Sequence, residues 1–322
     1  MVILGGYYFT SSILFQMALA ALKAWEATGE YITYGPFQHK LFVKQIGNSK
    51  ASPAKTLLLI HGYPESSYSY HAIIEGMQKL FERIILFDFI GYGWSDKPLK
   101  NYSYSLLEQA DTVFEVWKHF GITGGHLLAH DMGDSVATEI VARHENNLMP
   151  AWFSEGLQSL TFTNGSMVLE LASLRITQRI MLSSYGSWLT KTSSFAIFSH
   201  QVRSAQGNKN LSDDTVQALW EANRLQNGHR KLHLTIQYLN DRKKFEQTRW
   251  LPALSKTQLP THICWGDEDA VARVSMAQHL KEKVCPNATL TIMKGLGHFC
   301  QLGSPEKWIA HVSSFYETLL KY

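Results

Sequence analysis

Short apolar runs alternate with segments of helical period along most of the chain. Each run ends in a loop rich in Gly, Pro, Asp or Asn. Continuous apolar runs of this length are typical of strands buried on both faces, and such strands alternating with helices form a mainly parallel sheet. The pattern therefore predicts an α/β fold with helices on both faces of the sheet. The predicted strands are LFVKQI (41–46), TLLLI (56–60), RIILFDF (83–89), HLLAH (126–130), LQSLTF (157–162), THICW (261–265) and ATLTIM (288–293).

The strand signal stops between about residue 167 and residue 255. This stretch has helical periods instead, for instance over 213–226 and 232–245. Helices inserted between two strands would lie over the strand ends as a lid that walls a pocket and excludes water. The predicted parts of the chain are an apolar N-terminal segment (1–30), the first part of the core (31–166), a helical cap (167–255) and the second part of the core (256–322).

Residues 1–22 contain no charged side chain. A membrane-spanning helix needs about 20 apolar residues. This stretch has that length, but Gly, Ser, Thr and Gln dilute it and no basic region precedes it. Two interpretations stay open, a membrane anchor or uncleaved signal and an amphipathic helix packed on the body; cleavage at Ala18-Leu19-Ala20 is a third. The first would place the protein at a membrane such as the endoplasmic reticulum, and the second in the cytoplasm.

Charge and cysteine content exclude several kinds of partner. The chain has 322 residues and a net charge of +3, with 30 basic and 27 acidic residues spread along it. No basic stripe therefore indicates a nucleic-acid partner. The three cysteines, Cys264, Cys285 and Cys300, are far apart and odd in number. They predict buried thiols rather than a disulfide framework or a metal site.

Candidate chemistry begins at Ala129-His130-Asp131-Met132-Gly133, which joins a predicted strand to a helical run over 134–144. Small residues two positions before and two after the central residue allow the strained strand-to-helix turn that presents a nucleophile above a sheet. The central residue here is Asp131, where many sequences of similar pattern have serine. The alternative is that Asp131 only caps the following helix.

Two later loops supply partners for this aspartate. His298 follows the last predicted strand, and Asp269 follows the strand before it. This order of nucleophile, acid and histidine is that of hydrolases with a nucleophile elbow. Asp267 and Glu268 compete with Asp269 to orient His298, and the Gly-x-x-Asp spacing favours Asp269. Asn164 cannot take the role because its amide carries no charge to stabilise an imidazolium.

His61-Gly62-Tyr63-Pro64 follows a very apolar strand. Gly permits an unusual backbone angle and Pro fixes the turn, so the amide of Tyr63 can point into the site. Together with the amide of Met132, directly after Asp131, it would form an oxyanion hole. His61 is a further candidate for contact with the substrate.

Five motifs carry a resemblance to a known family: HGYPESSYSY (61–70), DFIGYGWSDKP (88–98), HDMGD (130–134), WGDEDAV (265–271) and GLGHF (295–299). Together they resemble the epoxide hydrolase and haloalkane dehalogenase group of α/β-hydrolases. Within that group, EYITY (30–34) and QYLNDRKKF (237–245) are similar to mesoderm-specific transcript-like proteins. The resemblance covers the chain from about Ala24 onward, and it implies the α/β-hydrolase fold with a helical cap between strands.

The resemblance also implies a covalent mechanism that needs no metal and no organic cofactor. Asp131 would attack a saturated carbon and form an ester, and His298, oriented by Asp269, would activate the water that hydrolyses it. An epoxide oxygen leaves as a basic alkoxide, to which epoxide hydrolases supply a proton from lid tyrosines; Tyr238 and Tyr185 are the candidates, with Tyr238 preferred. The predicted function is thus ring opening of a small apolar epoxide to a diol. The substrate would be lipid-derived if residues 1–22 bind a membrane.

Other functions on the same fold stay open. In dehalogenases of this group, Asn and Trp donors stand where this chain has Tyr63 and Met132, so a lid tryptophan such as Trp188 or Trp220 would have to bind the halide. Met132 also departs from the tryptophan common in epoxide hydrolases. A cofactor-free oxygenase of the luciferase type and a non-catalytic binding protein are the remaining alternatives.

Overall fold

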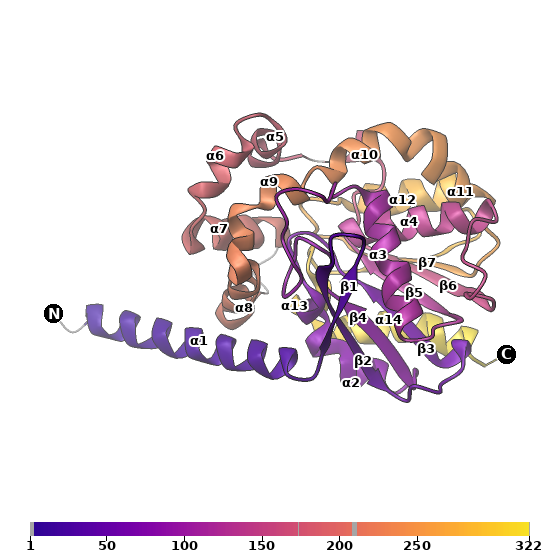
Figure 1. The fold of residues 1–322 in the computed structure, drawn as a ribbon, viewed down its shortest axis with the longest axis horizontal. Coiled ribbons are helices and arrows are strands. Elements are labelled where there is room, and N and C mark those ends of the chain that lie inside the picture. The colour runs from indigo at the N-terminus through magenta and orange to yellow at the C-terminus, as the bar shows by residue number, and fades with distance from the viewer. Residues whose placement is uncertain (1–2, 173, 208–210, 322) are drawn as a thin grey trace.

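The core of the molecule is an eight-stranded sheet in the order β1-β2-β4-β3-β5-β6-β7-β8 (Figure 1). The structure is a computed structural model that describes residues 3–172, 174–207 and 211–321, with side chains from residue 15 onward. The first two pairings, β1 with β2 and β2 with β4, are antiparallel, and all the others are parallel. The strands are β1 (Glu30–Tyr34), β2 (His39–Gly47), β3 (Thr56–Ile60), β4 (Arg83–Phe87), β5 (Gly124–His130), β6 (Gly156–Thr163), β7 (Thr261–Gly266) and β8 (Thr289–Met293).

Helices cover both faces of the sheet, as the apolar runs predict. Successive side chains of a strand point to opposite faces. In β3, Leu58 and Ile60 accordingly join one hydrophobic cluster, while Leu57 and Leu59 join another. The helices that pack in the first cluster are α3 (Leu106–His119), α4 (Met132–Glu145), α11 (Leu251–Lys256) and α12 (Val274–His279). Those in the second are α2 (Ile74–Met77), α13 (Cys300–Gly303) and α14 (Pro305–Leu319).

The edge strand β1 is absent from the strands predicted by the sequence pattern. Its five residues, EYITY, pair with β2 on one side only and are mostly exposed. A short edge strand with little buried surface carries neither a long apolar run nor a clear alternation, so its sequence resembles a loop. All seven predicted strands are present in the structure.

Before α11, the described part of the chain that follows β6 forms six α-helices, where the sequence predicts a cap. They are α5 (Ile176–Leu182), α6 (Gly186–Lys191), α7 (Phe195–Gln206), α8 (Asp213–Arg224), α9 (Leu232–Thr235) and α10 (Tyr238–Phe245). The predicted helix 213–226 ends earlier, because Gln226 and Asn227 adopt left-handed backbone angles. The predicted helix 232–245 is divided into α9 and α10.

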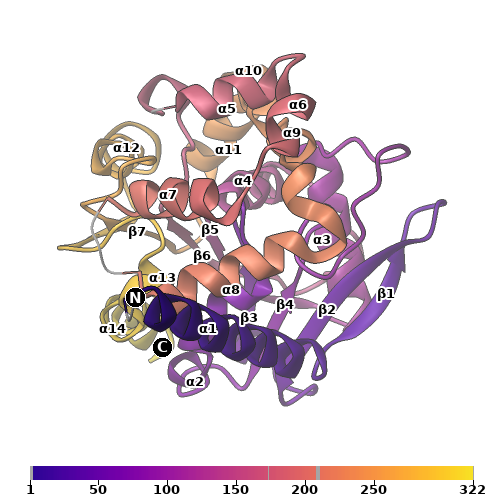
Figure 2. The same ribbon diagram turned by 90° about the vertical axis from the view of Figure 1, so that its left-hand side faces the viewer.

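Helix α1 (Ile3–Glu26) precedes the sheet, and its N-terminal part runs out from the body (Figures 1 and 2). Its C-terminal half packs beside α8, with Ala18 and Leu22 buried in a small apolar cluster that includes Phe42 and Trp94. In the part of the chain that the structure describes, no helix has the length and hydropathy to cross a membrane. The anchor predicted over 1–22 falls largely on side chains that lie outside the described residues.

Candidate active site

The turn that holds Asp131 is strained in the way the motif predicts. Asp131 lies between β5 and α4 with φ 49° and ψ −115°, a backbone conformation that residues other than Gly rarely adopt. Its carboxylate makes no capping hydrogen bond to α4. A Cβ at Gly133 would lie 2.6 Å from the Ile60 carbonyl oxygen, so only glycine lets α4 start this close to β3. This turn presents the Asp131 side chain to a pocket.

The loop after β3 brings a hydrogen-bond donor to this carboxylate. The Tyr63 amide donates to Oδ2 of Asp131 over 2.8 Å. Met132, the other predicted contributor, is the first residue of α4, and its Sδ accepts a hydrogen bond from the Tyr92 hydroxyl at 3.1 Å. One oxygen of Asp131 thus already lies at a backbone amide of the predicted oxyanion hole.

His61 has a different place from the one predicted. Its Nε2 accepts a hydrogen bond from the Phe89 amide, so Nδ1 carries the proton and donates to the Gly62 carbonyl. The ring is buried and is not among the residues that line the pocket. The prediction that His61 contacts substrate is therefore wrong: the ring ties the loops after β3 and β4 together and so positions Tyr63.

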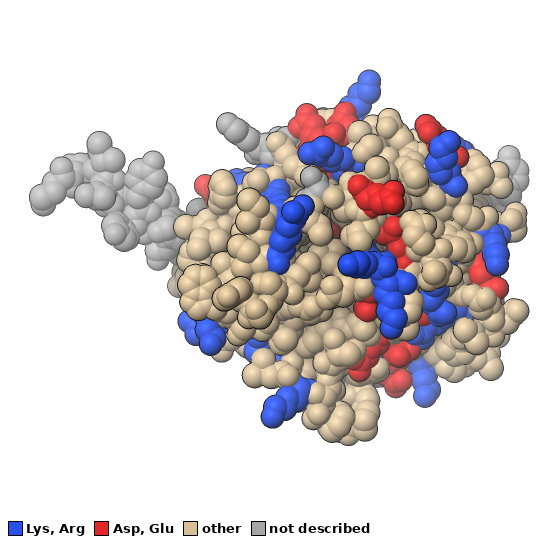
Figure 3. Space-filling model, turned by 90° about the horizontal axis from the view of Figure 1, so that it is seen from above, with Lys and Arg blue, Asp and Glu red and all other residues tan. Residues whose placement is uncertain are grey.

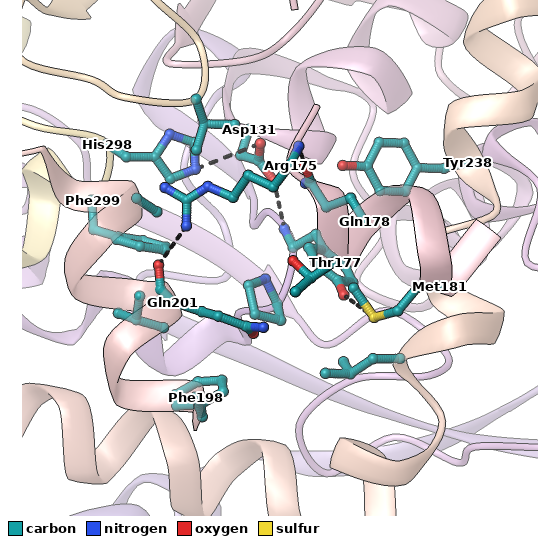
Figure 4. A pocket seen from close by; sticks show the side chains of 16 residues that line it. Asp131, Arg175, Thr177, Gln178, Met181, Phe198, Gln201, Tyr238, His298 and Phe299 are labelled. Atoms are coloured by element: carbon teal, nitrogen blue, oxygen red, sulfur yellow. Dashed lines mark hydrogen bonds and ion pairs between the residues drawn. The ribbon is translucent and has the colours of Figure 1, made fainter. Parts of the chain in front are cut away.

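His298 lies between two carboxylates. Its Nδ1 donates to Oδ2 of Asp269 at 2.8 Å, and its Nε2 lies 3.6 Å from Oδ1 of Asp131 (Figure 4). Asp267 and Glu268 are exposed, and Asp267 accepts the Gly295 amide instead. Among the three acids of this loop, the structure brings Asp269 to the histidine.

Asp269 is itself held in place by hydrogen bonds. Its Oδ1 accepts the amides of Val271 and Ala272 at 2.7 and 2.8 Å, and its Oδ2 accepts Nδ2 of Asn164 at 2.7 Å. Asn164 is fully buried after β6, and its Oδ1 accepts the Gly266 amide. The sequence argument excluded Asn164 as an acid and missed this positioning role, although an Asn directly after a predicted strand end was the available signal.

Glu65 is a buried carboxyl near the site that the sequence argument also missed. Burial, and next the charge of Asp131, raise the pKa of Glu65 to about 8. Its Oε2 accepts the Gly62 amide and its Oε1 accepts the Gln301 amide nitrogen, so it links the HGYP loop to α13. Burial also lowers the pKa of the neighbouring His130 to about 3, so both side chains of this pair favour their neutral forms near pH 7.

The opposing carboxylates control the protonation of His298. Burial alone would lower its pKa, but the charge and hydrogen bond of Asp269, together with the charge of Asp131, outweigh burial and raise the pKa to about 9. The imidazole is therefore protonated near pH 7 as long as Asp131 is ionised. Any reaction that neutralises Asp131 removes one of these charges and lowers the pKa of His298, so more of the imidazole is neutral near pH 7 and able to accept a proton.

The pocket over Asp131 is closed by residues of the cap (Figure 4). Tyr238 and Tyr63 both line it, with ring centroids 6.0 Å apart, and Figure 4 shows the Tyr238 hydroxyl turned toward the side on which Asp131 lies. Tyr185 is 70% exposed and does not line the pocket, so its selection as a lid tyrosine is wrong. The remaining lining residues are Pro64, Arg175, Thr177, Gln178, Met181, Phe198, Gln201, Val202, Ala205, Leu232, Val271, His298 and Phe299.

The tryptophans considered as halide donors also lie elsewhere. Trp188 is 66% exposed, Trp220 is buried against Phe198 in a separate cluster, and neither lines the pocket. Among the described residues, no group of three or more His, Cys, Asp or Glu side chains could hold a metal ion. The three cysteines are buried free thiols, as predicted.

Comparison with known proteins shows the family of this chain. A family model described as the alpha/beta hydrolase fold matches residues 55–305. The chain belongs to the α/β-hydrolase family. It is 31% identical to the mesoderm-specific transcript homolog protein of Homo sapiens over 291 residues, which cover 88% of this chain and 84% of that protein. The similarity to mesoderm-specific transcript proteins expected from the motifs is thereby confirmed.

This α/β-hydrolase is also similar to two proteins that are named as hydrolases. It is 34% identical to the putative hydrolase LipZ of Mycobacterium tuberculosis over 293 residues, covering 91% of this chain and 96% of LipZ. It is 25% identical to epoxide hydrolase 1 of Caenorhabditis elegans over 288 residues, covering 80% of this chain and 64% of that protein.

The contacts of His298 predict how its protonation responds to the neighbouring acids. Asp269→Asn should lower the pKa of His298 to well below 9, because the largest stabilising charge is lost while Oδ1 can still accept the amides of Val271 and Ala272. The measurement is NMR titration of labelled histidine, with the His298 signal assigned by its loss in His298→Gln. Asp267→Asn is the matched control and should leave that pKa unchanged. An equal change in both variants would contradict the assignment of Asp269.

Proposed function

We propose that this α/β-hydrolase opens epoxides to diols through an ester on Asp131. The observation that carries the proposal is a carboxylate at the nucleophile elbow, in a pocket where two tyrosine side chains and a histidine surround it. A carboxylate is a poor nucleophile for acyl transfer but a competent one at saturated carbon. The likeness to epoxide hydrolase 1 supports the same chemistry.

In the first step, Oδ1 of Asp131 would attack a ring carbon. Oδ2 is held by the Tyr63 amide, which leaves Oδ1 to form the new C–O bond. The ring C–O bond breaks as this bond forms, and the departing alkoxide takes the hydroxyl proton of Tyr238. Burial raises the pKa of Tyr238, so its phenol stays protonated near pH 7 and is available as an acid. The Tyr63 hydroxyl donates to Sδ of Met181 in the cap and would exchange this contact for the same oxygen.

In the second step, water would hydrolyse the ester. Esterified Asp131 has no charge, so the pKa of His298 falls and its proton passes to the Tyr238 phenolate. Neutral His298 then takes a proton from water, whose oxygen attacks the Asp131 carbonyl carbon, and the Tyr63 amide stabilises the oxyanion that forms at Oδ2. The diol oxygen leaves with the proton from His298, and the new carboxyl of Asp131 returns its own proton to His298.

The pocket walls support an apolar substrate with an anionic end. Met181, Phe198, Val202 and Leu232 supply apolar surface, and Arg175 is the single Lys or Arg among the lining residues. One Arg175 nitrogen donates to the Gln201 carbonyl, which fixes the guanidinium without neutralising its charge. An apolar epoxide that carries a carboxylate, such as one derived from a lipid, would satisfy both features.

Dehalogenation is less well supported than epoxide opening. The Asn and Trp side chains that dehalogenases of this group use to bind the halide are missing: Tyr63 and Met132 stand in their places, and Trp188 and Trp220 lie outside the pocket. A cofactor-free oxygenase and a non-catalytic binding protein have no feature of this site in their favour.

Trapping the ester tests the reaction class. The His298→Gln variant should still form the ester but fail to activate water, so incubation with an epoxide should raise its intact mass by the mass of the whole epoxide. The adduct should map to Asp131 by peptide mass spectrometry. The double variant Asp131→Asn/His298→Gln is the control and should gain no mass. An adduct formed from a haloalkane with loss of hydrogen halide would instead establish dehalogenation, and no adduct on folded protein would refute both.

The role of Tyr238 can be separated from that of the exposed cap tyrosine. In the His298→Gln background, Tyr238→Phe should slow ester formation by roughly 10²–10⁴-fold, since the alkoxide loses its proton donor. Tyr185→Phe is the matched control and should leave the rate unchanged, because Tyr185 lies outside the pocket. The measurement is the single-turnover rate of adduct formation. Equal rates in all three proteins would exclude Tyr238 as the acid.

Arg175 provides a test of the substrate class. Arg175→Gln should raise KM for a carboxylate-bearing apolar epoxide by roughly tenfold or more, as expected for a lost hydrogen bond to a charged group. The KM for the corresponding neutral ester should stay the same. Arg179→Gln, a change at an exposed position on the same helix, is the control. Equal effects of Arg175→Gln on both substrates would contradict recognition of the carboxylate.

A further inference from the structure

The cap contains a long segment without acidic residues. Residues 171–212 include no Asp or Glu, although at the chain's average of 27 acids in 322 residues a stretch of this length would hold three or four. The same segment has five basic residues, Arg175, Arg179, Lys191, Arg203 and Lys209. Lys209 lies outside the described residues, and Arg203 pairs with Asp213. Arg179 and Lys191 are exposed, and so is Arg230 in the segment Leu225–Arg230 that contacts α6.

Large apolar side chains are exposed on the same helices. Ile176 on α5 is 76% exposed and Trp188 on α6 is 66% exposed. Tyr185, Phe195 and Ile197 add to them, so this short segment holds five of the ten large apolar side chains that are exposed in the described part of the chain. We call these five residues, together with Arg179, Lys191 and Arg230, the cap face. Figure 3 views the molecule from above. Its left-hand lobe is mostly uncharged with a few Lys and Arg, whereas Asp and Glu gather mainly over the rest.

Two of the helices that carry the cap face also line the pocket. Helix α5 lines the pocket with Thr177, Gln178 and Met181, and α7 lines it with Phe198 and Gln201. Ile176 and Ile197 are chain neighbours of these lining residues but are turned to the surface. Helices α5, α6 and α7 lie on the side of the molecule from which α1 runs out (Figure 2).

We propose that the cap face binds the surface of an anionic lipid membrane. Trp and Tyr prefer the boundary between headgroups and acyl chains, Lys and Arg are attracted to anionic headgroups, and the missing carboxylates remove the repulsion that such a surface would otherwise cause. Aromatic and Arg side chains are also common in protein interfaces, and a requirement for anionic lipid distinguishes the two kinds of partner. The uncharged segment 1–22, which α1 directs to the same side, would reach the same lipid surface. Binding in this orientation places two helices that line the pocket, α5 and α7, at the membrane.

The proposal can be tested without any assay of catalysis. The full-length protein is mixed with vesicles of phosphatidylcholine alone or with added phosphatidylserine, and the bound fraction is measured by flotation. Binding should require phosphatidylserine and weaken with salt. When the acyl chains are brominated near the headgroup, tryptophan fluorescence should be quenched, and Trp188→Phe should abolish this quenching, because Trp188 is the one tryptophan among the large exposed apolar side chains of the described residues.

Paired variants test whether vesicle binding depends on the cap face while the N-terminal segment is left unchanged. Trp188→Ser/Phe195→Ser and Arg179→Glu/Lys191→Glu should each lower the partition coefficient by about tenfold or more, given the usual contribution of each basic residue and each buried apolar group. The control pairs, at exposed sites outside the cap, are Leu99→Ser/Leu148→Ser and Lys79→Glu/Lys118→Glu. Circular dichroism checks that every variant is folded. Absence of vesicle binding, equal binding to neutral vesicles, or equal losses in test and control pairs would each overturn the proposal.

Discussion

The carboxylate of Asp131 is the point on which the arrangement of the site depends. Its backbone is held at φ 49° by the closeness of α4 to β3, and its two oxygens then meet groups from loops distant in the sequence, the Tyr63 amide and the His298 ring. Each loop follows a different parallel strand, so the sheet brings their ends to one edge. The hydrogen-bonded sheet thus holds Asp131 in its strained backbone conformation. Strained residues usually persist only where the surrounding structure fixes them in this way.

The charges around Asp131 make the site change with its own chemistry. His298 lies between Asp131 and Asp269, while Glu65 and His130 behind them favour neutral forms. Few other ionised groups therefore screen the interaction of His298 with Asp131 in this buried region. A change in the charge of Asp131 accordingly has a strong effect on the pKa of His298. In the proposed reaction, this coupling allows one histidine to hold a proton first and to accept one later.

Much of the core and the order of the site residues could be predicted from the sequence, because their signals are local. Apolar runs show buried strands, and a small-x-Asp-x-small turn shows the elbow. The errors concern residues whose surroundings come from elsewhere in the chain. His61 follows a strand just as Asp131 does, but a contact with the Phe89 amide turns it into the core.

The same limit applies to the cap and to the supporting polar residues. The local sequence does not show which of Tyr185 and Tyr238 is buried, because both lie in segments of helical pattern. Only the packing of the folded chain leaves Tyr185 exposed and Tyr238 buried. Asn164 and Glu65 act through partners more than 100 residues away, Asp269 and Gln301, and no spacing rule connects such pairs. The strand β1 was missed for the opposite reason, since an edge with one partner buries too little to leave a pattern.

The connection between β6 and β7 divides the protein into a part that is fixed and a part that is free to vary. Helix α10 is tied to the core, because Arg242 donates to Ser135 on α4 and Asp241 accepts the amide of Leu106 on α3. Tyr238 therefore keeps its position relative to Asp131 through contacts that do not involve α5 to α7. Ala205 and Gln206 at the end of α7 accept the amides of Ala270 and His298 and so belong to the fixed part. Exchange of residues 174–204 between relatives would accordingly alter which molecules enter while the reacting groups keep their positions, so selectivity and reactivity can evolve, or be engineered, separately.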